Sequence, residues 1–206
     1  MVNKNALDPR VRRTRKLLQD ALIKLLHKRP ISKIQIKEIA QQAGMSRHAF
    51  YSNFETKEDL LLSYCDDVIF PIQREVFERA IAADYLDLEE INIAMFSHWE
   101  EHRDVLRWVM EMDNNSLFLN RLRGYVEPIV HIMEQIQTDT INDNQMQHFL
   151  VEYITGGIYM LLRYWVYEGK HLTHLDIGKV AYRLTSGSAG SIVQLVYPRD
   201  DEDRND

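Results

Sequence analysis

The chain has 206 residues, of which 45% are hydrophobic and 27% charged, and its formal net charge is -6 at pH 7. This apolar content is sufficient for a real core, either in one large helical domain or in a small domain followed by a larger one. No run of 18 uninterrupted apolar residues occurs, and the first residues carry charges where a signal peptide would be apolar, so we predict a soluble cytoplasmic protein without membrane contact. Cys65 is the single cysteine, which excludes an intrachain disulfide and a thiolate metal cluster.

The charges are distributed unevenly along the chain. Residues 1–60 hold 13 Lys and Arg against 6 Asp and Glu, a net charge of +7, whereas residues 61–206 hold 12 against 25, a net charge of -13. A basic first part attached to an acidic remainder is expected if the first part approaches DNA phosphates. The basic run from Arg10 to Lys16 contacts phosphates or a minor groove in this interpretation, and a merely solvated helix face remains the alternative.

The first predicted helix covers Val11–Lys28. Its apolar residues, among them Leu18, Leu22 and Leu25, recur at helical spacing and form one stripe, with charged side chains on the opposite face. Pro30 follows and ends the helix, because proline disfavours a helical residue before it. This pattern predicts an amphipathic helix that packs on the elements after it.

The stretch from Gln35 to Phe54, QIKEIAQQAGMSRHAFYSNF, predicts two short helices joined by a tight turn. Gly44 ends the first helix, because glycine adopts the left-handed conformation without steric cost, and Ser46 is a good N-cap for the second. Phe50 is expected to be buried. Four residues, Arg47, His48, Tyr51 and Ser52, then face outward. Such a helix-turn-helix has the geometry to enter the DNA major groove, although paired short helices also occur in many other all-helical proteins.

The rest of the chain is predicted to be helical as well, without strand alternation, so the fold class is all-α. The expected helices are Lys57–Phe70, ended or bent at Pro71, then Ile72–Ala83, Leu88–His102, Asp104–Glu111, Ser116–Gln137 with Pro128 inside, Gln145–Glu168, and one opened by Thr173 and closed by Pro198. The last two are strongly apolar and contain Gly156-Gly157 and the small-residue run 186–190. Because glycine inside a helix usually accompanies close backbone approach, these helices are candidates for a dimer interface.

The segment TRKLLQDALIKLLHKRPISKIQIKEIAQQAGMSRHAFYSNFETKEDLL resembles the N-terminal domain of TetR-type (TetR/AcrR) transcriptional regulators. A weaker resemblance links GGIYMLLRYWVYEGKHLTHLDIGKVAYRL to the C-terminal domain of one TetR-type subgroup. The resemblance implies a helix-turn-helix DNA-binding domain over residues 1–56, a ligand-binding and dimerisation domain over residues 57–198, and a charged, disordered tail over 199–206. It also implies a homodimer that binds an operator with two inverted half-sites.

The resemblance also assigns roles to single residues. It makes Tyr51 and Lys57 contacts to phosphate and Arg47 a contact to base or phosphate, roles that suit their donor groups. The predicted DNA-binding residues are Gln35, Lys37, Ser46, Arg47, His48, Tyr51, Ser52 and Lys57. Because the sequence departs from the common family pattern at Gln35 and at His48-Ala49, the operator sequence cannot be transferred from relatives.

A set of aromatic and histidine side chains suggests a pocket for an unknown small-molecule effector, because apolar faces with a few polar tips are the usual lining of such a cavity. Its predicted members are Phe96, Trp99, Trp108, Tyr125, His131, Tyr153 and Tyr164. Ordinary core packing of the same residues is the alternative.

Catalytic and metal chemistry are not indicated. His98 and His102 stand four residues apart in HWEEH, but no third ligand is evident, so we expect surface histidines and no bound metal or cofactor. No nucleophile with a base and an orienting group is recognisable, and we expect no enzymatic activity. The leading hypothesis is a dimeric repressor that a small molecule releases from its operator. The rival hypothesis is an adaptor or coactivator of the same fold that acts through a protein partner.

Overall fold

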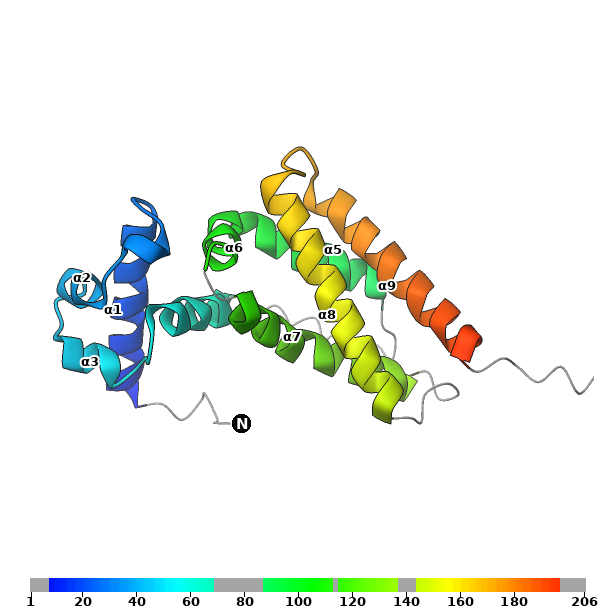
Figure 1. Cartoon of the computed structure of the whole chain (residues 1–206), viewed down its shortest axis with the longest axis horizontal. Helices are drawn as coiled ribbons and strands as arrows, with labels where there is room; N and C mark the ends of the chain where they lie inside the picture. The colour runs from blue at the N-terminus through cyan, green and yellow to red at the C-terminus, as the bar shows by residue number, and fades with distance from the viewer. Residues whose placement is uncertain (1–7, 69–86, 113–114, 137–143, 197–206) are drawn as a thin grey trace, which may run out of the picture. The chain divides into compact units, whose positions relative to one another are not determined.

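The structure, a computed structural model, describes residues 8–68, 87–112, 115–136 and 144–196. Within these ranges every regular element is helical, which confirms the predicted all-α class (Figure 1). None of the helices described there is both long enough and apolar enough to cross a membrane. The chain forms two compact units, Met1–Phe70 with Asp104–Phe118 and Pro71–Arg103 with Leu119–Asp206.

The first unit is organised on α1 (Pro9–Leu26). The Asp8 side chain accepts a hydrogen bond from the Arg10 amide, and Pro9 occupies the first turn, where its missing N–H is not needed. Leu18 and Leu22 are fully buried, as the apolar stripe predicts. The helix begins two residues before the predicted start and ends two before the predicted end.

Three short elements and a longer helix complete this part of the first unit. They are η2 (Ile31–Lys33), α2 (Ile36–Gln42), α3 (Arg47–Tyr51) and a helix at 57–68. The last helix buries Leu60 and Leu61 completely. Gln19 of α1 donates to the Ser63 hydroxyl at 2.9 Å and to the Asp67 carboxylate at 2.7 Å. These bonds join the 57–68 helix to α1, so the compact unit extends past the predicted boundary at residue 56.

The first unit also contains α6 (Arg103–Met110) from Asp104 onward. Trp108 of this helix is 4% exposed and meets the His27 ring edge to face, with 4.9 Å between ring centroids. His27 is the C-cap of α1. Trp108, predicted to line a ligand pocket, therefore packs within the unit that carries the helix-turn-helix.

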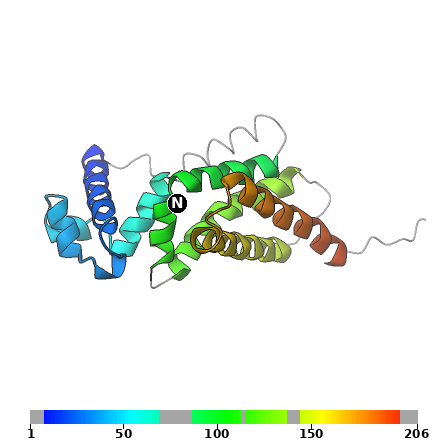
Figure 2. The ribbon, with the colours of Figure 1, turned by 90° about the horizontal axis from the view of Figure 1, so that it is seen from above.

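The second unit is built from α5 (Leu88–Glu101), most of α7 (Asn115–Ile136), α8 (Asn144–Tyr167) and α9 (His174–Val196). Helices α8 and α9 run side by side and are joined by a short loop (Figures 1 and 2). Leu122, Leu162 and Trp165 are fully buried among them. Pro128 lies inside α7, as predicted. The predicted helix Ile72–Ala83 and the tail 199–206 fall outside the described residues.

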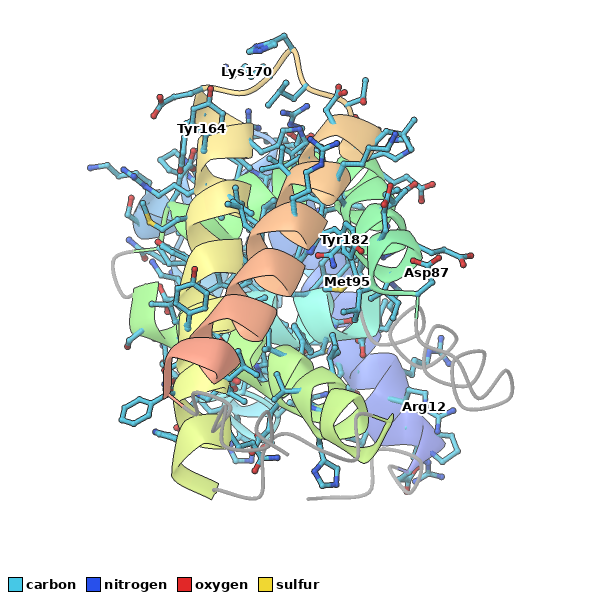
Figure 3. All side chains as sticks on the ribbon, turned by 90° about the vertical axis from the view of Figure 1, so that its right-hand side faces the viewer. Arg12, Asp87, Met95, Tyr164, Lys170 and Tyr182 are labelled. Atoms are coloured by element: carbon cyan, nitrogen blue, oxygen red, sulfur yellow. The ribbon has the colours of Figure 1, made fainter. Side chains whose placement is uncertain are left out.

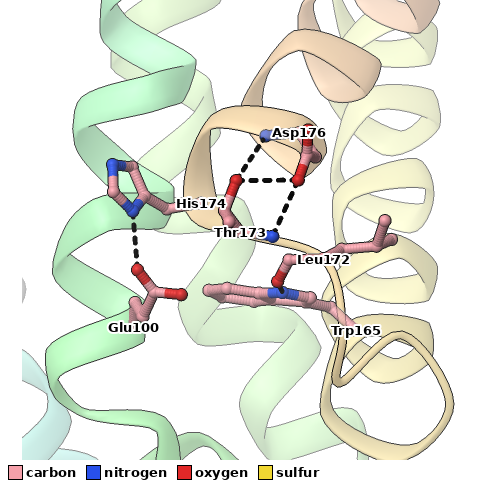
Figure 4. Close-up of polar contacts among 6 residues, drawn as sticks. All are labelled: Glu100, Trp165, Leu172, Thr173, His174 and Asp176. Carbon is pink, nitrogen blue, oxygen red and sulfur yellow. Dashed lines mark hydrogen bonds and ion pairs between the residues drawn. The ribbon is translucent and has the colours of Figure 1, made fainter.

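Helices α5 and α9 approach closely at Gly178. A side-chain carbon at this position would stand 2.8 Å from the Ile93 backbone, so only glycine permits the contact. Near the start of α9, the His174 ring lies 2.6 Å from the Glu100 carboxylate of α5 (Figure 4). The Thr173 and Asp176 side chains cap α9 reciprocally, as predicted, and these hydrogen bonds lower the pKa of Asp176.

Candidate nucleic-acid interface

Helix α2 is fixed at its start by Glu38. The Glu38 carboxylate accepts the Gln35 backbone N–H at 2.9 Å and a bond from the Arg29 guanidinium at 2.6 Å. The Gln35 bond first and the Arg29 bond second lower the pKa of Glu38, because both stabilise the ionised form. On the inner face of α2, Ile39 and Ala40 are buried, which positions the helix against the unit's core.

The turn between α2 and α3 follows the local rules of the sequence. Gly44 has a φ of 69°, the left-handed conformation predicted for it. The Met45 amide donates to the Ala40 carbonyl at 2.8 Å and closes the end of α2. Ser46 then caps α3 by accepting the Ala49 amide at 3.1 Å. These contacts set the direction in which α3 leaves the turn.

Helix α3 separates a buried side from an exposed side. Phe50 is fully buried, whereas the next residue, Tyr51, is 57% exposed. The two rings meet edge to face with centroids 5.6 Å apart, so the buried phenylalanine supports the exposed tyrosine ring. The remaining predicted DNA contacts of this segment are all exposed: Gln35, Lys37, Ser46, Arg47, His48 and Ser52. The Ser52 hydroxyl donates to the His48 carbonyl at 2.9 Å and retains its lone pairs for a further donor.

Lys57 has a structural role that the sequence did not predict. Its ammonium group donates to the Ile31 carbonyl at 2.7 Å and to the Ile34 carbonyl at 2.9 Å. Both acceptors belong to the connection that carries η2 into α2. Two of the three ammonium hydrogens are thereby used within the unit, which leaves one for a phosphate.

Arg15 is a second residue whose place was not evident from the sequence. Its guanidinium lies over the Phe54 ring, 4.1 Å from the centroid, and donates to the Asn53 carbonyl at 2.9 Å. It therefore holds the segment just after α3 against α1. The only signal in the sequence was its membership in a basic run, which indicated solvent or phosphate contact instead.

The second unit contains an apolar cleft with a cavity volume of about 50 Å³. We call it the α5–α9 cleft. Its lining residues are Leu88, Ile91, Asn92, Met95, Val126, Ile129, Val130, Ile154, Ile158 and Thr185. The Asn92 amide and the Thr185 hydroxyl donate to carbonyl oxygens of their own helices, Leu88 and Ala181, and the other eight lining residues are apolar. A cavity of this size and polarity suits part of an apolar molecule.

None of the seven residues predicted to bind a ligand lines this cleft. Phe96, Trp99 and Tyr125 are buried, and Phe96 packs edge to face on Trp165 with centroids 5.5 Å apart. His131, Tyr153 and Tyr164 are exposed, and Tyr164 stands on the surface of α8 near the loop with Lys170 (Figure 3). The prediction favoured aromatic side chains, whereas this cleft is lined mainly by aliphatic ones.

Two parts of the chain match known protein families. Residues 18–64 match the family described as "Bacterial regulatory proteins, tetR family", and residues 87–187 match "Transcriptional regulator C-terminal region". The chain belongs to the TetR family. The first match includes α2, α3 and the exposed face described above, and the second includes all the residues that line the α5–α9 cleft.

Solved structures share the TetR fold along most of the chain. A TetR transcriptional regulator from Streptococcus agalactiae is 23% identical with a TM-score of 0.58, and the match covers 89% of this chain and 99% of that one. Thermus thermophilus FadR, a TetR-family repressor in complex with lauroyl-CoA, is 17% identical with a TM-score of 0.62 and coverages of 84% and 93%. The dihydroxyacetone kinase operon activator DhaS is 18% identical, with a TM-score of 0.53 and coverages of 88% and 97%.

Proposed function

We propose that this protein is a dimeric, sequence-specific DNA-binding repressor that an apolar small molecule releases from its operator. The observation that carries DNA binding is the exposed face of α3, where Arg47, His48 and Tyr51 stand beside one another while Phe50 anchors the helix from below. Arginine can bond both guanine acceptors, and a phenol suits a phosphate oxygen. A protein that binds chromosomal DNA in this way acts in the cytoplasm.

The homodimer proposal rests on one exposed stripe of α8. Phe149, Tyr153, Met160, Tyr164 and Tyr167 are between 41% and 59% exposed. With exposed Gly157 between them, these positions recur at intervals of three or four residues, which places them along one helix face. A side chain at Gly157 would meet nothing within 4 Å in the single chain, so its missing side chain favours close approach by a second copy. We name this surface the α8 stripe.

The effector proposal rests on the α5–α9 cleft. Its lining, with eight apolar residues and no charged side chain, favours an apolar group over a charged one. Because the cavity is about 50 Å³, a ligand the size of a long acyl chain would require the lining helices to move apart. Such movement, transmitted to the two recognition helices of a dimer, would change their spacing and weaken operator binding. The lauroyl-CoA complex of the Thermus FadR gives a precedent for the ligand class.

The test is binding of the purified protein to duplex from the intergenic region upstream of its own gene, beside a scrambled duplex, at two salt concentrations. We expect selective binding that weakens as salt rises. Arg47→Ala should cost about 1–3 kcal/mol, or about 5- to 150-fold in Kd, if Arg47 contacts a base, and Tyr51→Phe should cost less.

Lys170→Ala is the matched control, because it removes one positive charge from an exposed loop of the second unit. It should leave Kd for the native duplex unchanged. Equal, weak binding of both duplexes, followed by failure to select any site from genomic DNA, would refute the repressor proposal and favour the adaptor hypothesis. Binding that activates transcription, the role named for DhaS, would retain DNA binding and refute repression.

A further inference from the structure

The C-terminal turn of α5 brings together three side chains with metal-binding atoms. His98, Glu101 and His102 each contribute one such atom, and these atoms all lie within 4.8 Å of one another. The His98 and Glu101 groups are 4.0 Å apart, and the two imidazole rings have centroids 4.8 Å apart. Residues at i, i+3 and i+4 share one helix face, which explains the convergence. Glu101 supplies a third candidate donor that the sequence pattern did not reveal.

The surroundings of this cluster suit a cation. The His98 side chain is 15% exposed and the Glu101 side chain 72% exposed, so the cluster has a sheltered side and an open side. The nearby Glu100 is already paired with His174 and remains outside the cluster. The carbonyl groups at the end of α5 add a negative dipole.

We propose that His98, Glu101 and His102 form a binding site for a divalent transition-metal ion of the Zn²⁺ class. Two imidazole nitrogens and one carboxylate oxygen are ligands that Zn²⁺, Ni²⁺ and Cu²⁺ accept, whereas Mg²⁺ and Ca²⁺ prefer oxygen ligands throughout. Three protein ligands leave the remaining coordination positions to solvent or to another group.

The geometry requires a modest adjustment. Zn–N and Zn–O distances of about 2.0–2.1 Å place neighbouring ligands of a tetrahedral site roughly 3.3 Å apart. The candidate ligand atoms lie within 4.8 Å of one another, so side-chain rotations that move them by roughly 1–2 Å would close the site. Glu101 is largely exposed, so its side chain can move with little effect on packing, and His102 lies at the C-cap, where α5 ends. Binding would fix the last turn of α5.

The experiment is Zn²⁺ titration of untagged, metal-free protein in competition with a chromophoric chelator, without DNA. We expect one Zn²⁺ per chain. His98→Gln, His102→Gln and Glu101→Gln should each weaken Zn²⁺ affinity at least about tenfold, because even loss of residues that only support metal ligands costs about that much. His171→Gln is the control, since His171 is exposed in the loop before α9 and should leave affinity unchanged.

A thermal melt provides the second measurement. Zn²⁺ that binds the folded chain should raise Tm, and Glu101→Gln should reduce this rise without altering the metal-free Tm, because the replaced side chain is exposed. The proposal is overturned if wild-type protein fails to compete with the chelator, if the three cluster variants retain wild-type affinity, if His171→Gln weakens binding as much as they do, or if Mg²⁺ raises Tm equally. These outcomes do not depend on operator binding, so they test the metal site separately from the proposed function.

Discussion

The ammonium nitrogen of Lys57 lies 2.9 Å from the carbonyl oxygen of Ile34, the residue that directly precedes the N-cap of α2. Together with the bond to Ile31, this contact ties the start of the 57–68 helix to the segment that orients the helix-turn-helix. A lysine predicted to contact phosphate thus supports the element that carries the other predicted DNA contacts.

We expect Lys57→Met to destabilise the protein in the absence of DNA. The substitution removes the two hydrogen bonds that the charged ammonium group donates to the Ile31 and Ile34 carbonyls. Because Lys57 is half-buried, the free energy of unfolding should fall by about 1–3 kcal/mol. Calorimetry of the free protein measures this change.

Lys37→Met is the matched control, because Lys37 is an exposed lysine on α2. It should leave the free energy of unfolding within about 0.5 kcal/mol of wild type while weakening DNA binding. If Lys57→Met behaved like Lys37→Met, with unchanged stability and weaker DNA binding, its role would be in phosphate contact alone.

Lys57 and Gly44 illustrate how far the sequence was informative. The left-handed glycine, the Ser46 cap and the buried Phe50 depend on local chemistry within a few residues, so they could be predicted. The hydrogen-bond partners of Lys57 and Arg15 are separated from them by 23 to 38 residues in the sequence. No spacing rule identifies such contacts before the helices are packed.

The ionised Glu38 carboxylate contributes to stability in a way that depends on pH. Because folding lowers the pKa of Glu38 below its ordinary value of 4.5, the contribution is complete above that value and is lost as the pH falls through the lower, folded-state pKa. We therefore expect Glu38→Gln to flatten the acid side of the Tm-versus-pH curve. Glu55→Gln, at an exposed position before the 57–68 helix, is the comparison and should preserve the wild-type slope.

The α8 stripe predicts the effect of a charge on assembly. Met160 is 55% exposed in the single chain, and in the proposed dimer it would be covered by the partner. Met160→Glu would place an unpaired charge in that contact and should convert the dimer to monomer in sedimentation equilibrium. Leu117→Glu alters an exposed leucine of α7 that is not a member of the stripe and should leave the dimer intact. A dimer that survives Met160→Glu would have to use another surface.

The lining of the α5–α9 cleft could not be predicted from the sequence. The prediction favoured aromatic side chains, but Phe96, one of those predicted, packs on Trp165 in the core. Met95 and Ile129 line the cleft instead. Aliphatic residues at helical spacing serve equally as core or as pocket lining, and only the packing of α5, α7, α8 and α9 distinguishes the two.

Filling the α5–α9 cleft should abolish the response to an apolar effector while preserving DNA binding. Ile129 lines the cleft and is half-buried, so Ile129→Phe can project a larger side chain into a cavity of about 50 Å³. Because the cavity accommodates part of the added volume, the free energy of unfolding should fall by less than the roughly 1–3 kcal/mol typical of overpacking.

Dodecanoic acid, which supplies the acyl chain of lauroyl-CoA, is the probe. It should raise the Tm of wild-type protein and weaken its operator binding. In Ile129→Phe, both effects should require a dodecanoic acid concentration at least about tenfold higher. This corresponds to a loss of about 1.4 kcal/mol in binding free energy. Leu175→Phe, at an exposed position on α9, controls for added apolar surface. An unchanged response in Ile129→Phe would place the effector outside this cleft.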